Sequence, residues 1–220
     1  MEYLSKNPSA DRQRLINQVA EGLVYLHGRE PPVVHSDIKP ANVLVSDEGN
    51  AKLCDFGISK LVLENPSGFT TTASVKGTLR YSSAEMLDGQ STTRSDVWAF
   101  GMLILHVMTS KIPYAEILSD VKVILAIMGG QRPLPENYSD LPSTDPLWDV
   151  MGECWCEDPM KRPTMTEVFD KLHISDVALD IPACPDIVPA QLRLEDNNPA
   201  EQQAPRPPED INSAEQALRV

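Results

Sequence analysis

The most constraining feature of the sequence is an apolar stretch at residues 97–108, interrupted only by Gly101 and His106. This stretch is far shorter than the roughly 20 apolar residues that are needed to span a bilayer. We therefore interpret it as a buried core helix rather than as a membrane segment.

Other segments also have helical periodicity. One apolar helix face is formed by Leu15, Ile16, Val19, Leu23 and Leu26. Ser9 or Asp11 could cap the start of this helix, and Gly28 would end it. Further helices are expected at residues 95–109, 119–128, 145–156 and 164–173, which are separated by prolines.

The strand signal is small. Two short apolar runs at residues 43–45 and 51–54 flank a turn that contains Gly49, which predicts a β-hairpin. Residues 55–85 are rich in Ser, Thr and Gly and show no persistent period, so we expect a long loop there that is either functional or disordered. The predicted fold is mainly α with a small β-hairpin edge.

The C-terminal part of the chain has a different composition. After Asp180, seven prolines lie among Gln, Asn, Glu and Ala. Such a segment cannot bury enough apolar surface to offset the entropy lost on ordering. We expect one domain at residues 1–179 and a Pro-rich, disordered tail at residues 180–220.

Charge and cysteine content limit the possible partners. The formal net charge is -13 and the pI about 4.7, which disfavours nucleic acid and anionic membranes as partners. The four cysteines lack zinc-ligand spacing, and the first residues contain no apolar run that would form a signal peptide. A soluble, cytoplasmic protein is therefore expected.

Polar residues with potential chemistry gather between the short strands. His35, Asp37, Lys39 and Asn42 occupy one loop, and Asp55 follows the predicted hairpin in the sequence Asp-Phe-Gly. Phosphoryl transfer needs metal ions, a carboxylate near the attacking hydroxyl, and a cation on the phosphate. Carboxylate and amide oxygens suit Mg²⁺, and the lysine supplies the cation.

These residues resemble the catalytic loop H-R-D-x-K-P-x-x-N and the D-F-G motif of protein kinases. The resemblance implies that Asp37 is the catalytic base and that Lys39 contacts the transferred phosphate. It also implies that Asn42 and Asp55 bind Mg²⁺ and that Leu44 lies beneath the adenine of ATP. The expected cofactors are ATP and Mg²⁺, and the expected partner is a protein substrate.

Three later segments resemble kinase motifs in the family's order: residues 77–85 the end of the activation segment, 96–101 the start of the central helix, and 154–163 a late motif. The pattern is most similar to tyrosine-kinase-like serine/threonine kinases.

The later motifs carry further expectations about contacts. The resemblance implies a buried pair between Glu85 and Arg162. It also implies that Asp96 holds the backbone of the catalytic loop, and that Thr78 bridges Asp37 and Lys39.

The sequence also departs from the kinase pattern. Ser36 stands where most members have an arginine that grips an activation-loop phosphate, and no Gly-rich loop or Val-Ala-Ile-Lys strand is present. We therefore expect the C-lobe portion of a kinase domain, with the N-lobe missing or separate. A pseudokinase or scaffold module that binds partners without catalysis is the alternative, and a small-molecule phosphotransferase ranks last.

Overall fold

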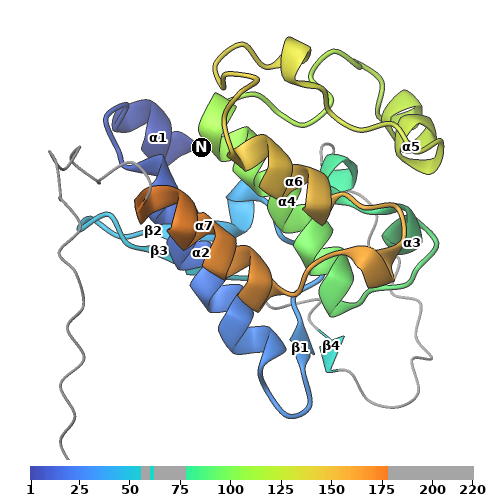
Figure 1. The fold of residues 1–220 in the computed structure, drawn as a ribbon, viewed down its shortest axis with the longest axis horizontal. Helices are drawn as coiled ribbons and strands as arrows, with labels where there is room; N and C mark the ends of the chain where they lie inside the picture. The colour runs from blue at the N-terminus through green and yellow to red at the C-terminus, as the bar shows by residue number, and fades with distance from the viewer. Residues whose placement is uncertain (56–59, 62–77, 178–220) are drawn as a thin grey trace, which may run out of the picture. The chain divides into compact units, whose positions relative to one another are not determined.

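The apolar stretch forms helix α4 (Thr93–Thr109) in the computed structural model, which describes residues 1–55, 60–61 and 78–177 (Figure 1). A capping box formed by Thr92 and Ser95 begins this helix, and every residue at positions 95–106 is buried. The prediction of a core helix is confirmed.

Three other helices pack around α4. Helices α2 (Arg12–His27) and α6 (Leu147–Cys154) contact it, and α7 (Met165–Val177) packs against α2 and α6. Figure 1 shows α2 and α7 running side by side. The carboxylate of Asp11 accepts a hydrogen bond from the backbone N–H of Arg14 at the start of α2, and Gly28 ends the helix, both as predicted.

The strands form two separate pairs. Strand β2 (Val43–Val45) pairs with β3 (Ala51–Leu53) in an antiparallel hairpin, with Val43 opposite Leu53, and β3 packs on α2. The hairpin prediction is confirmed. Strand β1 (Val33–Val34) pairs instead with β4 (Lys60–Leu61), which follows it by more than 25 residues.

The remaining described elements are short: α1 (Glu2–Lys6), η1 (Pro40–Asn42), η2 (Thr78–Tyr81), α3 (Ala84–Leu87), α5 (Asp120–Met128), η3 (Pro135–Asn137) and η4 (Pro159–Lys161). One expectation was wrong in part, because the segment expected to be one loop at residues 55–85 contains β4, η2 and the start of α3. No helix was expected at the position of α1. These elements are too short to show a period.

Two further expectations concern membrane-spanning helices and the C-terminal tail. The described part of the chain contains no helix that is both long enough and apolar enough to cross a bilayer. The predicted tail at residues 180–220 lies outside the described residues.

Gly101 allows α4 and α6 to approach closely. A Cβ atom added to Gly101 would lie 2.7 Å from Nε1 of Trp155 and 2.9 Å from Cβ of Cys154. Both neighbours are buried, with exposed fractions of 4% and 0%. The glycine that interrupts the apolar stretch is therefore required by the packing of the core.

Replacing Gly101 with alanine should lower the free energy of unfolding by about 1–3 kcal/mol, because the new methyl group overpacks a core that has no room for it. Gly152→Ala in α6 is the matched control, since a Cβ there would meet nothing within 4 Å. This control should gain up to about 1 kcal/mol from helix propensity. Denaturant unfolding of both variants measures the difference, and equal effects would contradict the packing argument.

Candidate active site

The loop at residues 35–42 is attached to the core through one buried carboxylate. Asp96, in the first turn of α4, is only 1% exposed. Its two oxygens accept hydrogen bonds from the backbone N–H groups of His35 and Ser36, each at 2.8 Å. The predicted role of Asp96 in holding this loop is confirmed.

A third group reaches the same carboxylate. Nε2 of His27, at the end of α2, lies 3.0 Å from Oδ2 of Asp96. This contact joins α2, α4 and the 35–42 loop at one point. Sequence reasoning missed His27, because 69 positions separate the two residues and His27 otherwise resembles any residue in the last turn of a helix.

Ser36 takes an unusual backbone conformation. Its φ of 70° lies in the left-handed region, which residues with a Cβ rarely adopt. The side chain is buried, and its hydroxyl accepts a hydrogen bond at 2.9 Å from the hydroxyl of Ser91. A neutral hydrogen bond therefore occupies the place where the kinase pattern has an arginine.

The imidazole of His35 links the loop to the end of β3. Nδ1 accepts a hydrogen bond from the backbone N–H of Asp37 at 3.3 Å, and Nε2 lies 3.1 Å from the carbonyl oxygen of Cys54. With Nδ1 as acceptor, the ring proton belongs on Nε2, which then donates to Cys54. His35 therefore has a structural role in this loop.

Asp37, Lys39 and Asn42 are brought together. Oδ2 of Asp37 accepts hydrogen bonds from Nζ of Lys39 at 2.6 Å and from Nδ2 of Asn42 at 2.8 Å. The side chains of Asp37 and Lys39 are 13% and 15% exposed, so this charge pair remains accessible while much of its surface is buried. Nζ of Lys39 also donates to Oγ1 of Thr78 at 3.2 Å, which confirms the lysine side of the predicted bridge.

Asp55 stands beside this group through the backbone. The N–H of Cys54 donates to the carbonyl oxygen of Asn42 at 3.0 Å, and Asp55 follows directly, exposed and with a φ of 63°. The side chain of Asn42 directs its nitrogen toward Asp37, so its oxygen is the atom that could bind a metal. One amide and one carboxylate oxygen are the donor types that suit Mg²⁺.

No larger metal-binding group accompanies these two residues. Within the described ranges, no cluster of three or more His, Cys, Asp and Glu side chains could hold a metal ion. Two oxygen donors would leave the other positions of a bound metal to water or phosphate, which is the usual behaviour of Mg²⁺.

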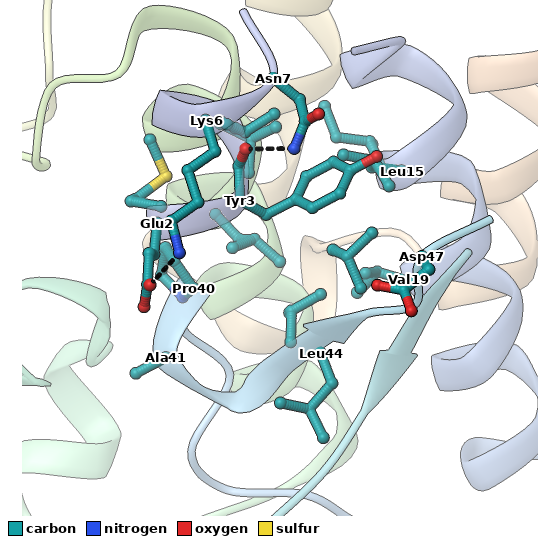
Figure 2. Close-up of a pocket in the computed structure, with 17 residues that line it drawn as sticks. Glu2, Tyr3, Lys6, Asn7, Leu15, Val19, Pro40, Ala41, Leu44 and Asp47 are labelled. Atoms are coloured by element: carbon teal, nitrogen blue, oxygen red, sulfur yellow. Dashed lines mark hydrogen bonds and ion pairs between the residues drawn. The ribbon is translucent and has the colours of Figure 1, made fainter. Parts of the chain in front are cut away.

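Leu44 points away from the core. It lies on β2 with 60% of its surface exposed, although its neighbours in the hairpin are half-buried. It lines a cavity of about 600 Å³ between β2, α1 and α2. Figure 2 shows Leu44 on this hairpin, with Tyr3 of α1 and Leu15 of α2 among the other lining residues. Leu44 therefore presents an apolar side chain at the edge of this cavity.

Glu85 and Arg162 form the predicted buried pair. Nη1 and Nη2 of Arg162 donate to the two oxygens of Glu85 at 2.5 Å and 3.0 Å, and the arginine side chain is 1% exposed. Arg162 also donates to the carbonyl oxygens of Cys156 and Arg94. Burial alone would raise the pKa of Glu85, but the hydrogen bonds that its carboxylate accepts, those from Arg162 foremost, together with the charge of Arg162 lower that pKa.

The turn η2 is anchored on two sides. The hydroxyl of Tyr81 is hydrogen-bonded to Nδ1 of His106 on α4 at 2.5 Å, in a buried environment. The buried guanidinium of Arg80 donates to the carbonyl oxygens of Pro113, Tyr114 and Ile117 and to the carboxylate of Asp120. Sequence reasoning assigned no role to these side chains, although both Arg80 and Tyr81 lie within the 77–85 motif.

Comparison with known proteins agrees with this geometry. The sequence model of the family described as "Protein kinase domain" matches residues 2–174. The chain therefore belongs to the protein kinase domain family.

Three similar proteins are all named as serine/threonine kinases. A serine/threonine-protein kinase/receptor of Acanthamoeba polyphaga mimivirus is 37% identical, over 77% of this chain and 10% of its own length. Receptor-interacting serine/threonine-protein kinase 3 of Rattus norvegicus is 34% identical, over 73% and 35%. Serine/threonine-protein kinase CTR1 of Arabidopsis thaliana is 33% identical, over 74% and 19%. The chain thus spans about a third or less of each relative.

Arg162→Ala should lower the free energy of unfolding by about 3–5 kcal/mol, because Glu85 would keep its charge without its partner. Lys6→Ala is a suitable control, since Lys6 pairs with Glu2 on the surface, where the two side chains are 70% and 82% exposed. Losing that exposed pair should cost less than about 1 kcal/mol. Urea unfolding of the two variants tests the contrast, and a small loss for both would argue against a structural role for the buried pair.

The burial of His106 predicts a pH dependence of stability. Burial lowers the pKa of His106 from its ordinary value of 6.5 to about 4. Between these values the unfolded chain binds a proton that the folded chain does not bind, so stability should fall as the pH is lowered through this window. His106→Asn does not titrate and should show a shallower fall.

This comparison has an internal reference. Above pH 7, His106 is neutral in both the folded and the unfolded state, so the wild type and His106→Asn should give parallel curves of unfolding free energy against pH. Equal slopes between pH 6.5 and pH 4 would show that His106 does not govern this dependence.

Proposed function

We propose that the chain is the C-lobe portion of a protein serine/threonine kinase domain, which transfers the γ-phosphoryl group of ATP to protein hydroxyls. The observation that carries this proposal is the carboxylate of Asp37, held between Lys39 at 2.6 Å and Asn42 at 2.8 Å. A carboxylate in this position can accept a hydroxyl proton, and the adjacent ammonium can neutralise a phosphoryl group. Family membership and the names of the relatives support the same reaction.

In the proposed reaction, the substrate hydroxyl oxygen attacks the γ-phosphorus while the bond to the oxygen that bridges the β- and γ-phosphates breaks. The hydroxyl proton passes to Asp37, and ADP leaves with the electron pair of the broken bond. Lys39 balances charge on the transferred group, and its 3.2 Å contact with Thr78 fixes the position of the ammonium. When bound, Mg²⁺ would be held by oxygens of Asn42 and Asp55 and would neutralise phosphate charge.

The rest of the ATP site would come from an N-lobe that is a separate or additional segment. The 60% exposure of Leu44 supports this assignment, because an apolar residue that contacts adenine needs a second surface on the other face of the base. We further assign residues 1–179 to the kinase domain and 180–220 to a disordered tail, in a cytoplasmic protein most similar to tyrosine-kinase-like serine/threonine kinases. These assignments rest on the sequence motifs and composition.

A module that binds partners without catalysis is the second candidate. The exposed adenine-side surface around Leu44 favours it, because the described residues leave that surface uncovered. The paired Asp37, Lys39 and Asn42 favour catalysis, since a scaffold has no need for a carboxylate held in this arrangement.

An activity assay separates the two candidates. With Mg²⁺ and labelled ATP, the chain alone should be nearly inactive, whereas a chimera with the N-lobe of a relative fused before Met1 should approach the roughly 1–100 s⁻¹ of active kinases. Asp37→Asn in that chimera should lower kcat by about 10²–10⁴-fold, which is the contribution of a general base.

Asp149→Asn is the matched control, because Asp149 is exposed on α6, a helix that contributes no residue to the proposed site. It should leave kcat unchanged. An ATP-binding but inactive chimera, in which Asp37→Asn changes nothing, would favour the scaffold instead.

A further inference from the structure

The connection between α3 and α4 donates a hydrogen bond into the 35–42 loop. The hydroxyl of Ser91 donates to the hydroxyl of Ser36 at 2.9 Å, although 55 positions separate the two residues. Ser36 is 8% exposed, and Ser91 is half-buried. Satisfying a buried polar group is the ordinary role of such a contact, but the backbone of Ser36 indicates a further one.

Ser36 is held in a strained conformation. Its φ of 70° lies in the left-handed region, which a residue with a Cβ occupies only at a cost in energy. Strained backbone of this kind persists only where the surrounding structure holds it. Two contacts do so here, because the backbone N–H of Ser36 donates to Asp96 at 2.8 Å and its side chain accepts from Ser91. The first contact holds the backbone nitrogen and the second holds the side chain, so the two together restrain the orientation of the residue.

Ser91 is itself fixed from both sides. Directly before it, the backbone N–H of Gln90 donates to the carbonyl oxygen of Glu85 at 2.8 Å. The side chain of Glu85 is held in turn by the buried guanidinium of Arg162. Directly after it, Thr92 is the N-cap of α4 and takes part in the capping box of that helix. A donor that is fixed in this way can impose a conformation on its acceptor instead of following it.

The conformation of Ser36 determines where the carboxylate of Asp37 lies. Asp37 is the next residue, and its Oδ2 must reach Lys39 and Asn42, which it contacts at 2.6 Å and 2.8 Å. A return of Ser36 to the usual negative φ would redirect the chain at Asp37 and move the carboxylate away from both partners. The hydrogen bond from Ser91 therefore acts on the site through the backbone.

We propose that Ser91 is a positioning residue, whose hydroxyl holds Ser36 in the left-handed conformation that places the carboxylate of Asp37 in the site. The effect of Ser91 on the backbone of the loop is independent of catalysis, whereas its effect on turnover rests on the proposed kinase function. Two measurements address these two effects separately.

Hydrogen exchange, measured by NMR on the full chain, tests the effect on the loop. Loss of one hydrogen bond changes a local equilibrium by roughly two- to tenfold. The amide of Ser36 should exchange faster by about this factor in Ser91→Ala, while the amide of Met102, in the buried middle of α4, should keep its wild-type rate. Ser91→Thr keeps a hydroxyl and should restore slow exchange at Ser36. Ser143→Ala, at an exposed serine before α6, is the matched control and should change neither rate.

Steady-state kinetics of the chimera with an N-lobe test the effect on turnover. Ser91→Ala and Ser36→Ala remove the same hydrogen bond from its two sides, so each should lower kcat by about two- to tenfold and leave KM for ATP unchanged. The double variant should be no slower than either single variant, because two residues joined by one interaction do not have additive effects. Ser91→Thr should recover most of the wild-type kcat. A bond that only stabilises the fold would lower the unfolding midpoint without changing kcat.

Several results would overturn the proposal. One is an unchanged exchange rate at Ser36 in Ser91→Ala, and another is equal acceleration at Ser36 and Met102, which would show a general loss of stability. In an active chimera, an unchanged kcat in Ser91→Ala or additive losses in the double variant would overturn it as well. If the chimera with the native residues is inactive, the proposed function fails, and the exchange rates still decide whether Ser91 positions the loop.

Discussion

The buried carboxylate of Asp96 is the interaction on which the arrangement of the site depends. A charge that is 1% exposed is costly unless it is paired and hydrogen-bonded. Here the backbone N–H groups of His35 and Ser36 and the ring of His27 meet that requirement. The same hydrogen bonds attach the 35–42 loop to α4. Asp37 directly follows Ser36, so these hydrogen bonds also fix the position of its backbone.

Local periodicity explains which parts of the fold could be predicted. α2 is long, has a cap that the sequence displays, and buries a face of regular spacing, whereas α4 is a long apolar run that is buried on all sides. α1 spans only five residues, little more than one helical turn, and such a segment has no readable period. β4 pairs with β1 across a large sequence separation. A two-residue segment is a strand only because of this pairing, and its own sequence shows no alternating pattern from which a strand could be predicted.

In the site too, local features could be predicted from the sequence and contacts with distant residues could not. The spacing of Asp37, Lys39 and Asn42 suggested their chemistry, because all three lie on one short loop. The contacts that position the loop come from distant residues, such as Ser91, which is 55 positions from its partner Ser36. A serine hydroxyl that bonds another serine cannot be told from a solvated one in the sequence. The positive φ of Ser36 is equally hidden, since nothing marks it as a residue held in the left-handed region.

Arg80 connects the site to α5. Its guanidinium is buried and is satisfied by backbone carbonyls from Pro113 to Ile117 together with the carboxylate of Asp120, the first residue of α5. Moving η2 away from α5 would leave this charge without acceptors in the interior, which costs several kcal/mol. Thr78, at the other end of η2, contacts Lys39. The start of α5 and the ammonium beside Asp37 are therefore linked through η2, so the segment that leads into α5 also helps to position the site.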